Sequence, residues 1–287
     1  MQLIDGKRRA AGILEEVKAN VEQQLRQGGP RPGLVVVLVG EDAASEVYVR
    51  NKEKRAKEAG FNGRLIRLPA STSESGLLAV VDELNRDSSV HGILVQLPLP
   101  KQIDEQAVIS AISPEKDVDG FHEVNSGRLL NGDSRAMVPC TPLGCLYLLE
   151  SVIPDLTGMH AVIIGRSNIV GKPLSLLLLQ KSCTVTMTHS KTSDLASFCA
   201  GADIVVAAVG VPELVKADWV KPGAVVIDVG INRVTREGRQ VLVGDVDFDA
   251  VKNQASAITP VPGGVGPMTI ACLLKNTLEA ARKSMQV

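Results

Sequence analysis

One lysine in the segment SEVYVRNKEKRAKEAG, residues 45–60, stands where a helix usually buries apolar side chains. On a helical wheel, Lys52 lies in the middle of a stripe that also holds Tyr48, Val49 and Ala56. Most helical lysines extend along the protein surface and have no chemical role. Tyr48, however, precedes Lys52 by about one helical turn, so the ring and the ammonium lie side by side. The pair could therefore present a flat apolar surface and a proton carrier to one ligand.

Polar side chains that could join this lysine follow a predicted strand and a predicted turn. Gln96, in VQLPLPKQ, comes at the carboxyl end of a strand, where open α/β sheets bind their ligands. It could equally be a strand-end amide that its neighbours satisfy. In SPEKDVDGFHEVN, Asp117 and Asp119 precede Gly120, which indicates an Asx-turn. The two aspartates could bind a metal ion, but no further carboxylates are spaced to complete a calcium loop, and we expect no metal site.

The segment PVPGGVGP, residues 260–267, combines three prolines and three glycines directly before a predicted helix. Such a constrained backbone is costly unless a loop must hold one shape against another group. A structural linker is the alternative interpretation. Because the segment lies between two predicted domains, it could also form one wall of a cleft.

A strand, a glycine-containing turn and an amphipathic helix follow one another in HAVIIGRSNIVGKPLSLLLLQ, residues 160–180. This order is typical of a Rossmann unit, where glycines let the backbone approach a pyrophosphate and the helix start supplies N–H donors. Gly165 and Gly171 do not have the usual G-x-G-x-x-G spacing, so an ordinary turn between strand and helix stays open. A later strand ends at Gly210, which would let a cofactor ring pass close to the backbone.

The next predicted strand ends in HSKTSD, residues 189–194, which is rich in hydrogen-bond donors and cations. NAD enzymes usually carry an acidic residue here for the ribose 2′-hydroxyl. Ser190 and its neighbours, together with Arg166 in the preceding turn, suit a 2′-phosphate better and favour NADP. Alternatively, the cations are solvated loop residues and Asp194 binds the ribose of NAD.

Apolar, β-branched runs alternate with amphipathic stretches along the chain. Runs that are apolar almost throughout predict parallel strands covered on both faces, and their alternation with helices predicts an α/β fold. The expected strands are residues 34–40, 64–69, 91–100, 160–165, 183–188, 202–210, 223–230 and 256–261, and the expected helices lie near 6–27, 43–60, 73–87, 104–112, 143–153, 171–182, 192–200 and 268–285.

A proline-containing seam near residues 137–160 predicts two α/β domains. We expect a first, catalytic domain of residues 1–139 that is completed by the C-terminal helix, 268–287. We expect a second, Rossmann-type domain of residues 140–267. An active-site cleft would lie between them.

The composition argues against several classes of protein. The chain has 287 residues, a net charge of −1 and only 2% aromatic residues, so we expect no nucleic-acid-binding surface. Its five cysteines form no C-x-x-C pair, so we expect neither disulfide scaffolding nor structural zinc. Free thiols suit a reducing compartment, and we therefore expect a cytoplasmic location. The N-terminus has no apolar signal core, and no apolar run is long enough to span a membrane.

Taken in order, these motifs resemble the bifunctional methylenetetrahydrofolate dehydrogenase/methenyltetrahydrofolate cyclohydrolase family, the FolD type. Each motif is weak alone, but the series runs through the whole chain in the family's order. The motifs are YVRNK (48–52), GILVQLPLP (92–100), PEKDVDGF (114–121), PCTPLG (139–144), GRSNIVGKP (165–173), HSKT (189–192), DVGIN (228–232), GDVDF (244–248) and PVPGGVGPMT (260–269).

The resemblance implies oxidation of 5,10-methylenetetrahydrofolate with NADP and hydrolysis of the methenyl product to 10-formyltetrahydrofolate. It also implies a role in one-carbon metabolism and purine biosynthesis, and a homodimer joined through the cofactor domains. By position, Lys52 would be the catalytic lysine, Tyr48 an aromatic plate beside the folate, and Gln96 the partner of the lysine. Asp119 would bind the pterin end of the folate. Further folate contacts are implied at Leu97, Pro98, Pro262, Gly263 and Gly264.

The resemblance also implies a set of cofactor contacts in the second domain. Arg166 and Ser190 would hold the 2′-phosphate of NADP. The full set is Gly165, Arg166, Ser167, Ile169, Val170, Gly171, His189, Ser190, Lys191, Gly210 and Ile231.

Two other classes of protein stay open at this level. A different two-domain NADP dehydrogenase, such as one of the shikimate type, could share the domains and a lysine, but we would not expect QLPLP and PGGVGP in it. A non-catalytic nucleotide-binding regulator would keep GRSNIVGKP and would not need Lys52 on a buried stripe.

Overall fold

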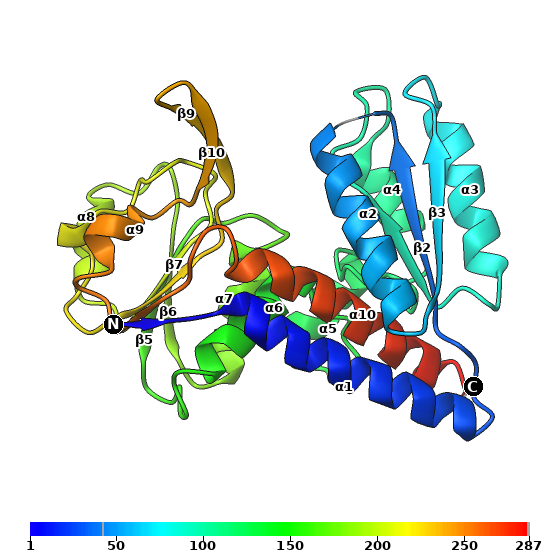
Figure 1. Cartoon of the computed structure of the whole chain (residues 1–287), viewed down its shortest axis with the longest axis horizontal. Helices are drawn as coiled ribbons and strands as arrows, with labels where there is room; N and C mark the ends of the chain where they lie inside the picture. Colours follow the sequence, from blue (N-terminus) through cyan, green and yellow to red (C-terminus); the bar gives the residue numbers. More distant parts are fainter. Residues whose placement is uncertain (42, 286–287) are drawn as a thin grey trace. The chain divides into compact units, whose positions relative to one another are not determined.

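The chain forms two compact units in the computed structural model, which describes residues 1–41 and 43–285 (Figure 1). The first unit consists of Ala11–Cys140 and Ile270–Val287, and the second consists of Met1–Ala10 and Thr141–Thr269. Each unit contains a parallel sheet with helices, so the predicted two-domain α/β class is confirmed. Among the described residues, no helix is both long and apolar enough to cross a bilayer.

The N-terminal residues differ from the expected domain boundaries, because they belong to the second unit. Strand β1 (Gln2–Leu3) pairs in parallel with β11 (Ala257–Ile258), and the backbone N–H of Ile4 donates to Ile258 O at 2.9 Å. A two-residue edge strand has no hydrophobic periodicity that sequence analysis could detect, since only its backbone makes the pairing. The boundary between the units therefore falls inside helix α1 (Gly6–Arg26).

A three-stranded parallel sheet in the order β3-β2-β4 forms the centre of the first unit. Every residue of β2 is buried, as expected for a central strand covered on both faces. Its alternate residues Val35, Val37 and Val39 pack in one apolar cluster with residues of α3 and α4. The elements of this sheet layer are β2 (Gly33–Val39), α2 (Ala43–Glu58), β3 (Asn62–Leu68), α3 (Glu74–Arg86), β4 (Gly92–Val95), α4 (Glu105–Ala111) and α5 (Glu123–Leu130).

The last helix, α10 (Val265–Lys283), lies along α1 and brings the end of the chain back to the first unit (Figure 1). Arg282 of α10 donates to Asn20 Oδ1 of α1 at 2.9 Å. Asn276 of α10 donates from Nδ2 to Val118 O and to Val138 O, both at 2.9 Å. The C-terminal helix thus ties together segments that lie far away in the sequence.

The second unit contains a six-stranded parallel sheet in the order β1-β11-β8-β7-β5-β6. Strand β5 pairs with β6 on one side and with β7 on the other, so the direction of chain progression reverses at β5. Open α/β sheets bind their ligands at such a switch point. The elements of this unit also include α6 (Cys140–Glu150), β5 (His160–Ile164), α7 (Gly171–Gln180), β6 (Thr184–Thr188), α8 (Leu195–Ala200), β7 (Ile204–Ala207), the 3₁₀ helix η1 (Ala217–Trp219), β8 (Val225–Asp228) and α9 (Phe248–Val251).

An antiparallel hairpin in the second unit was not predicted from the sequence. Strands β9 (Asn232–Arg236) and β10 (Arg239–Val243) are joined by a two-residue turn. Glu237 and Gly238 both have positive φ, at 50° and 73°, as a type I′ turn requires. The flanking segments NRVTR and RQVLV do not alternate regularly in polarity, so the Glu-Gly pair between them was the signal that the sequence offered.

Several strands are shorter than predicted, most clearly β4, β7, β8 and β11. Strand β4 ends at Val95, β7 at Ala207 and β8 at Asp228. Proline has no N–H for a sheet, so the QLPLP segment cannot continue β4. The residues after each of these strands therefore leave the sheet at its carboxyl edge.

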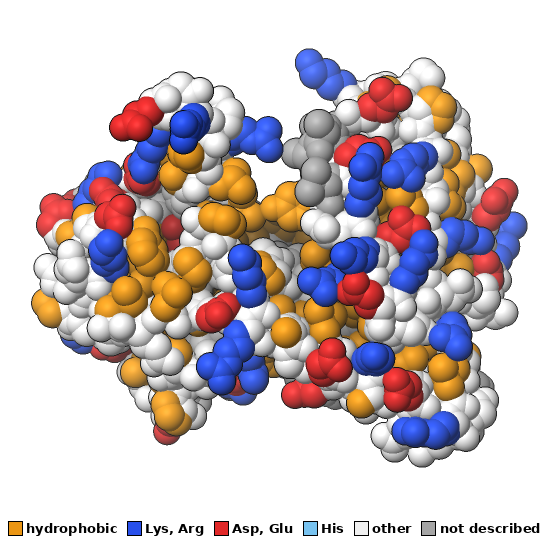
Figure 2. Space-filling model, in the orientation of Figure 1, with side chains coloured by type: hydrophobic (Ala, Val, Ile, Leu, Met, Phe, Trp, Pro, Cys, Tyr) orange, Lys and Arg blue, Asp and Glu red, His pale blue; other side chains and the backbone are white. Residues whose placement is uncertain are grey.

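The surface of the first unit carries charges of both signs. Figure 2 shows basic and acidic side chains interspersed over it. On α2, Lys57 pairs with Glu53 at 2.8 Å and Arg50 pairs with Glu46 at 3.0 Å. Arg50 and Lys57 are exposed and their acidic partners are half-buried, and together they form the solvated side of the helix that carries Lys52.

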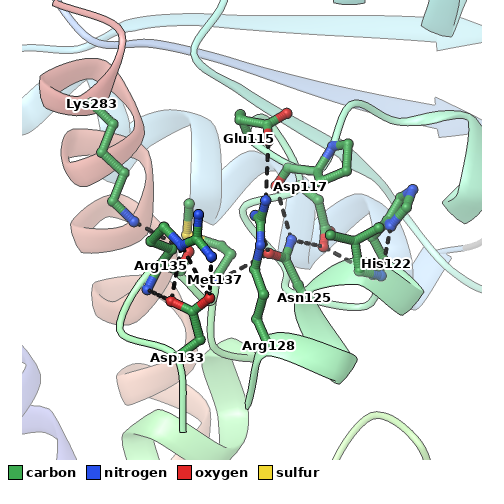
Figure 3. A network of polar contacts seen from close by, with 11 residues as sticks. Glu115, Asp117, His122, Asn125, Arg128, Asp133, Arg135, Met137 and Lys283 are labelled. Carbon is green, nitrogen blue, oxygen red and sulfur yellow. Dashed lines mark hydrogen bonds and ion pairs between the residues drawn. The ribbon is translucent and has the colours of Figure 1, made fainter. Parts of the chain in front are cut away.

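A buried network holds the turn that contains the two aspartates (Figure 3). Asp117 accepts hydrogen bonds from the backbone N–H groups of Gly120, Phe121 and His122 at 3.1, 3.2 and 2.9 Å. Asn125 Nδ2 donates to the same carboxylate at 2.9 Å. The predicted turn is present, but it is not an Asx-turn, because Asp117 accepts from N–H groups three to five residues on and not from the N–H two residues on.

Asn125 and Lys116 connect this turn to its surroundings. Asn125 also donates from Nδ2 to Pro114 O at 2.8 Å and accepts at Oδ1 from the N–H of Met137 at 3.2 Å. Lys116 Nζ donates to Leu84 O, Asn85 O and Asp87 O at 3.1, 2.8 and 2.8 Å, at the end of α3. Burial lowers the pKa of Lys116, opposed by the charge of Asp87. The turn is thereby fixed at both ends.

We predict opposite effects for two glycine substitutions in the first unit. A Cβ at Gly33 would overlap Ser89 O, so Gly33→Ala should lower the free energy of unfolding by about 1–3 kcal/mol. Gly12 lies in α1 with nothing within 4 Å of a Cβ, so Gly12→Ala should raise it by about 0.5–1 kcal/mol. Urea denaturation followed by circular dichroism measures both. Equal effects of the two variants would contradict the packing around Gly33.

We predict that Asn125→Leu lowers the free energy of unfolding by about 2–3 kcal/mol, because it leaves buried polar partners unsatisfied. Arg128→Leu is the matched control in the same network, since it removes a 3.5 Å ion pair with the exposed Glu115 and a long, 3.5 Å hydrogen bond to Asn125 Oδ1. Such a pair contributes less than about 1 kcal/mol. The same denaturation experiment checks the difference, and a larger effect of the arginine variant would refute the role of Asn125.

Candidate active site

The amine of Lys52 is buried in the first unit and has a defined partner. The residue is 7% exposed, and its Nζ donates to Gln96 Oε1 at 2.9 Å. Val49 and Ala56, on the same stripe of α2, are fully buried. Tyr48 is 41% exposed, so it lies at the rim of this stripe rather than inside it. The helix thus buries a cation where the sequence predicted it.

The amide of Gln96 is oriented by its own surroundings at the end of β4. Its backbone N–H donates to Val37 O at 2.8 Å, which extends the pairing of β4 with β2 by one bond. Its Nε2 donates to Leu97 O at 2.8 Å, so Oε1 faces the lysine. The Leu97–Pro98 peptide bond that follows is cis. Gln96 is therefore a satisfied strand-end amide and also the partner of Lys52.

Asp119 and Cys140 lie close to this pair in the same unit. Burial raises the pKa of Asp119, while the charge of Lys52 and a hydrogen bond from Cys140 lower it. Burial and the neighbouring Asp119 hold the pKa of the Cys140 thiol well above its usual range. The thiol also donates to Val118 O at 3.2 Å. The arrangement combines a lysine, a carboxyl group and a neutral thiol.

Sequence analysis assigned no role to two residues that build this side of the site. Cys140 belongs to the PCTPLG motif, which was noticed only as part of a series. Asn276 lies in α10 and fixes the carbonyl groups of Val118 and Val138, which flank the turn and Cys140. A lone asparagine in a C-terminal helix has no sequence signal that would connect it with residues so far away.

The turn after β5 in the second unit shows close backbone approaches. Gly165 has φ +124°, and a Cβ there would overlap Ala208 O after β7. A Cβ at Gly171 would overlap Gly165 O. Ser167 Oγ accepts from the N–H groups of Val170 and Gly171 at 3.1 and 3.3 Å at the start of α7. The two predicted glycines are thus needed for the turn itself, at the switch point of the sheet.

Exposed donors follow the ends of β5 and β6, as predicted. Arg166, Ser190 and Lys191 are exposed. His189 is used inside its loop, because its Nδ1 accepts from the N–H of Lys191 at 3.2 Å and its own N–H donates to Thr192 Oγ1 at 3.0 Å. Donors of this kind fit the phosphates of a dinucleotide better than they fit an uncharged ligand. Ile169, Gly210 and Ile231 are exposed near the same sheet edge.

The proline- and glycine-rich segment packs against the start of α1 in the second unit. The N–H of Lys7 donates to Gly263 O at 3.1 Å, and a Cβ at Gly6 would overlap Gly264 O. The Val261–Pro262 peptide bond is cis. The segment is therefore held in one shape by its neighbours and is more than a plain linker.

The described residues divide the expected site residues between the two units. Tyr48, Lys52, Gln96 and Asp119 belong to the first, and the residues of the glycine turn, the donor loop and the 260–269 segment belong to the second. No group of three or more His, Cys, Asp or Glu side chains that could hold a metal ion occurs in the described part of the chain.

Two family models match most of the chain. The catalytic domain of tetrahydrofolate dehydrogenase/cyclohydrolase matches residues 4–119. The NAD(P)-binding domain of the same family matches residues 139–285.

Relatives and solved structures agree with these matches. Bifunctional protein FolD 3 from Ectopseudomonas mendocina is 62% identical over 282 residues, which cover 98% of this chain and 91% of that protein. The FolD methylenetetrahydrofolate dehydrogenase/cyclohydrolase from Campylobacter jejuni is 46% identical, with 99% of each chain covered and a TM-score of 0.95. The Trypanosoma brucei enzyme, solved with NADP and an inhibitor, is 41% identical, with 99% and 98% covered and a TM-score of 0.95.

The shikimate dehydrogenases, the alternative class considered from the sequence, are similar to this chain only in fold. A shikimate dehydrogenase from Aquifex aeolicus covers 89% of this chain but is 13% identical, with a TM-score of 0.51, and shares only the fold. Since the two domain models and the FolD relatives match over nearly the whole length, this chain belongs to the tetrahydrofolate dehydrogenase/cyclohydrolase family.

Proposed function

We propose that this chain oxidises 5,10-methylenetetrahydrofolate with NADP and hydrolyses the resulting methenyl compound to 10-formyltetrahydrofolate. The observation that carries the proposal is the buried Lys52 amine, which donates to Gln96 Oε1 at 2.9 Å. Family membership supports both activities, because the relatives are named as bifunctional enzymes.

The oxidation step requires that the protein position the substrate and the cofactor, and it does not require a general base. Hydride leaves a carbon that is flanked by two nitrogens, and these nitrogens stabilise the cation that forms. No proton has to be removed in this step, so the protein contributes mainly orientation. In this proposal the half-exposed ring of Tyr48 supplies a flat surface for the folate, and Leu97 and Pro98, which follow Gln96 in the chain, provide further contacts.

NADP, when bound, supplies the hydride acceptor. The residues of the second unit fit it: close-packed glycines at 165 and 171 let the backbone approach the pyrophosphate, and Arg166, Ser190 and Lys191 offer donors for a 2′-phosphate. Ser167 orders the start of α7. We assign the remaining expected contacts, Ile169, Val170, His189, Gly210 and Ile231, to the same cofactor site.

The hydrolysis step needs a proton carrier. Water adds to the cationic carbon and loses a proton, and a C–N bond then breaks while its nitrogen gains a proton. Lys52 can accept the first proton as an amine and return it as an ammonium. Gln96 keeps Nζ in one orientation without adding charge.

Asp119 completes the substrate side of this proposal. Its carboxyl group can accept hydrogen bonds from the paired N–H donors of a pterin ring. Pro262, Gly263 and Gly264 are proposed as further folate contacts, because their segment is held in one shape.

We also infer a cytoplasmic homodimer whose product supplies one-carbon units for purine biosynthesis. Cys140, Cys183, Cys199 and Cys272 are buried free thiols, which suits a reducing compartment. The second unit exposes Phe198, Val211 and Leu242, apolar side chains that a second copy could cover.

We predict that Lys52→Met abolishes hydrolysis of methenyltetrahydrofolate, because the variant lacks the amine that carries the proton in this proposal. The loss of methenyl absorbance over time measures this activity. Lys57→Met is the matched control on the same helix, since Lys57 is exposed and pairs with Glu53 at the surface, and this variant should hydrolyse at the rate of the parent. Full hydrolysis by the Lys52 variant would remove this lysine from the mechanism.

We predict that Arg166→Ala raises KM for NADP about tenfold while KM for NAD changes little. The guanidinium would contact the 2′-phosphate, which NAD lacks, and a charge-assisted bond of this kind is worth roughly 1.5–3 kcal/mol. Initial rates of reduction with either cofactor provide the measurement. A parent enzyme that prefers NAD, or equal losses with both cofactors, would overturn the assignment of Arg166.

A further inference from the structure

Two deeply buried aspartates in the second unit have no part in the chemistry proposed above. Asp228 is 3% exposed and ends β8, and Asp245 is fully buried just after β10. They belong to the DVGIN and GDVDF motifs. Buried carboxylates are costly unless several donors surround them, so their contacts need an explanation.

Asp245 joins segments that follow three different strands. Its Oδ2 accepts from the backbone N–H groups of Val209 and Gly210, after β7, at 2.7 and 2.9 Å. Its Oδ1 accepts from Asn232 Nδ2, at the start of β9, at 2.8 Å. The carboxylate of Asp245 therefore fixes both the backbone of Val209 and Gly210, after β7, and the side chain of Asn232, after β8.

Asp228 holds Asp245 in place. Its Oδ1 accepts from the N–H groups of Gly230 and Asp245 at 3.0 and 2.9 Å, and its Oδ2 accepts from Val246 N–H at 3.0 Å. Its own N–H donates to Thr259 Oγ1 at 2.8 Å. Burial raises the pKa of Asp228 to about 7, opposed by these N–H donors.

Two glycines provide the space that the carboxylates occupy. A Cβ at Gly230 would overlap Asp245 Oδ1, and a Cβ at Gly244 would overlap Asp228 Oδ2. Each carboxylate thus fills the place of a side chain that the opposing segment lacks. The segment of Asp228 and Gly230 and the segment of Gly244 and Asp245 are therefore complementary in shape.

We propose that Asp245 and Asp228 form a clasp that positions the cofactor-binding loops at the carboxyl edge of the second sheet. The loops in question are Val209–Gly210 and Gly230–Ile231, and Gly210 and Ile231 are expected cofactor contacts. Both aspartates are positioning residues, because they act through these backbones. The inference rests on the proposed function of this edge in binding NADP.

The two proposed activities allow a selective test in the full chain. Asp245→Ala removes the acceptor for the N–H groups of Val209 and Gly210 and for Asn232 Nδ2. These donors belong to residues that are at least partly exposed, where water can replace the carboxylate, so the protein should still fold. The loops would lose their fixed positions, and a small misplacement of bound groups can lower a reaction rate by up to about a hundredfold. We expect KM for NADP in the dehydrogenase assay to rise about ten- to hundredfold, while kcat/KM for hydrolysis of supplied methenyltetrahydrofolate stays within about twofold.

Three further variants separate positioning from general destabilisation. Asp245→Asn should recover most of the NADP affinity, because its amide oxygen can face Val209 and Gly210 while Asn232 rotates its amide to accept the new N–H. Asn232→Ala should have an intermediate effect, and it also carries the test if Asp245→Ala does not fold. Asp249→Ala is the control, since this exposed aspartate forms an ion pair with Lys252 at the surface and should leave both activities unchanged.

The outcomes are distinct. An unchanged KM for NADP in folded Asp245→Ala and in Asn232→Ala, or parallel losses of both activities, would overturn the clasp. If the parent protein itself does not reduce NADP with methylenetetrahydrofolate, the proposed function fails instead.

Discussion

The buried amine of Lys52 imposes the central constraint on the first unit. An ammonium group taken out of water needs an acceptor, and Gln96 Oε1 supplies one at 2.9 Å. That oxygen faces the lysine because the other end of the amide is bonded to Leu97 O, and the residue itself is bonded to Val37 at the end of the sheet. Burial of Lys52 therefore requires that helix α2 and the residue after β4, Gln96, lie within hydrogen-bonding distance of each other.

Buried acceptors play the corresponding part in the second unit. The glycine turn after β5 lacks the G-x-G-x-x-G spacing that is common in dinucleotide-binding proteins. Its backbone nevertheless packs so closely against the end of β7 that a side chain at Gly165 would overlap Ala208 O. The loops after β7 and β8 are then tied by the carboxylates of Asp245 and Asp228. A carboxylate that accepts several N–H bonds can order irregular backbone where no strand pairing is available.

Sequence patterns were most reliable where burial repeats along the chain. The apolar run of β2 and the stripe of α2 follow directly from the periods of strand and helix, and both were predicted. The strand β1 and the hairpin β9–β10 were missed, because one is two residues long and the other is largely exposed. Strand ends were overestimated at Val95, Ala207 and Asp228, since apolar character continues after the pairing stops.

The sequence by itself determined the α/β class, the inward position of Lys52 and the family, because periodicity, motif order and residue type are local properties of the chain. Only the tertiary structure decided which polar groups meet. Asp117 became the acceptor of a turn, and Cys140 and Asn276 came to lie beside Asp119 and its neighbours. Asp245 came to hold residues 209–210 across the sheet edge. These contacts join residues that are distant in sequence, and hydrogen-bond geometry exists only once the strands and helices have packed.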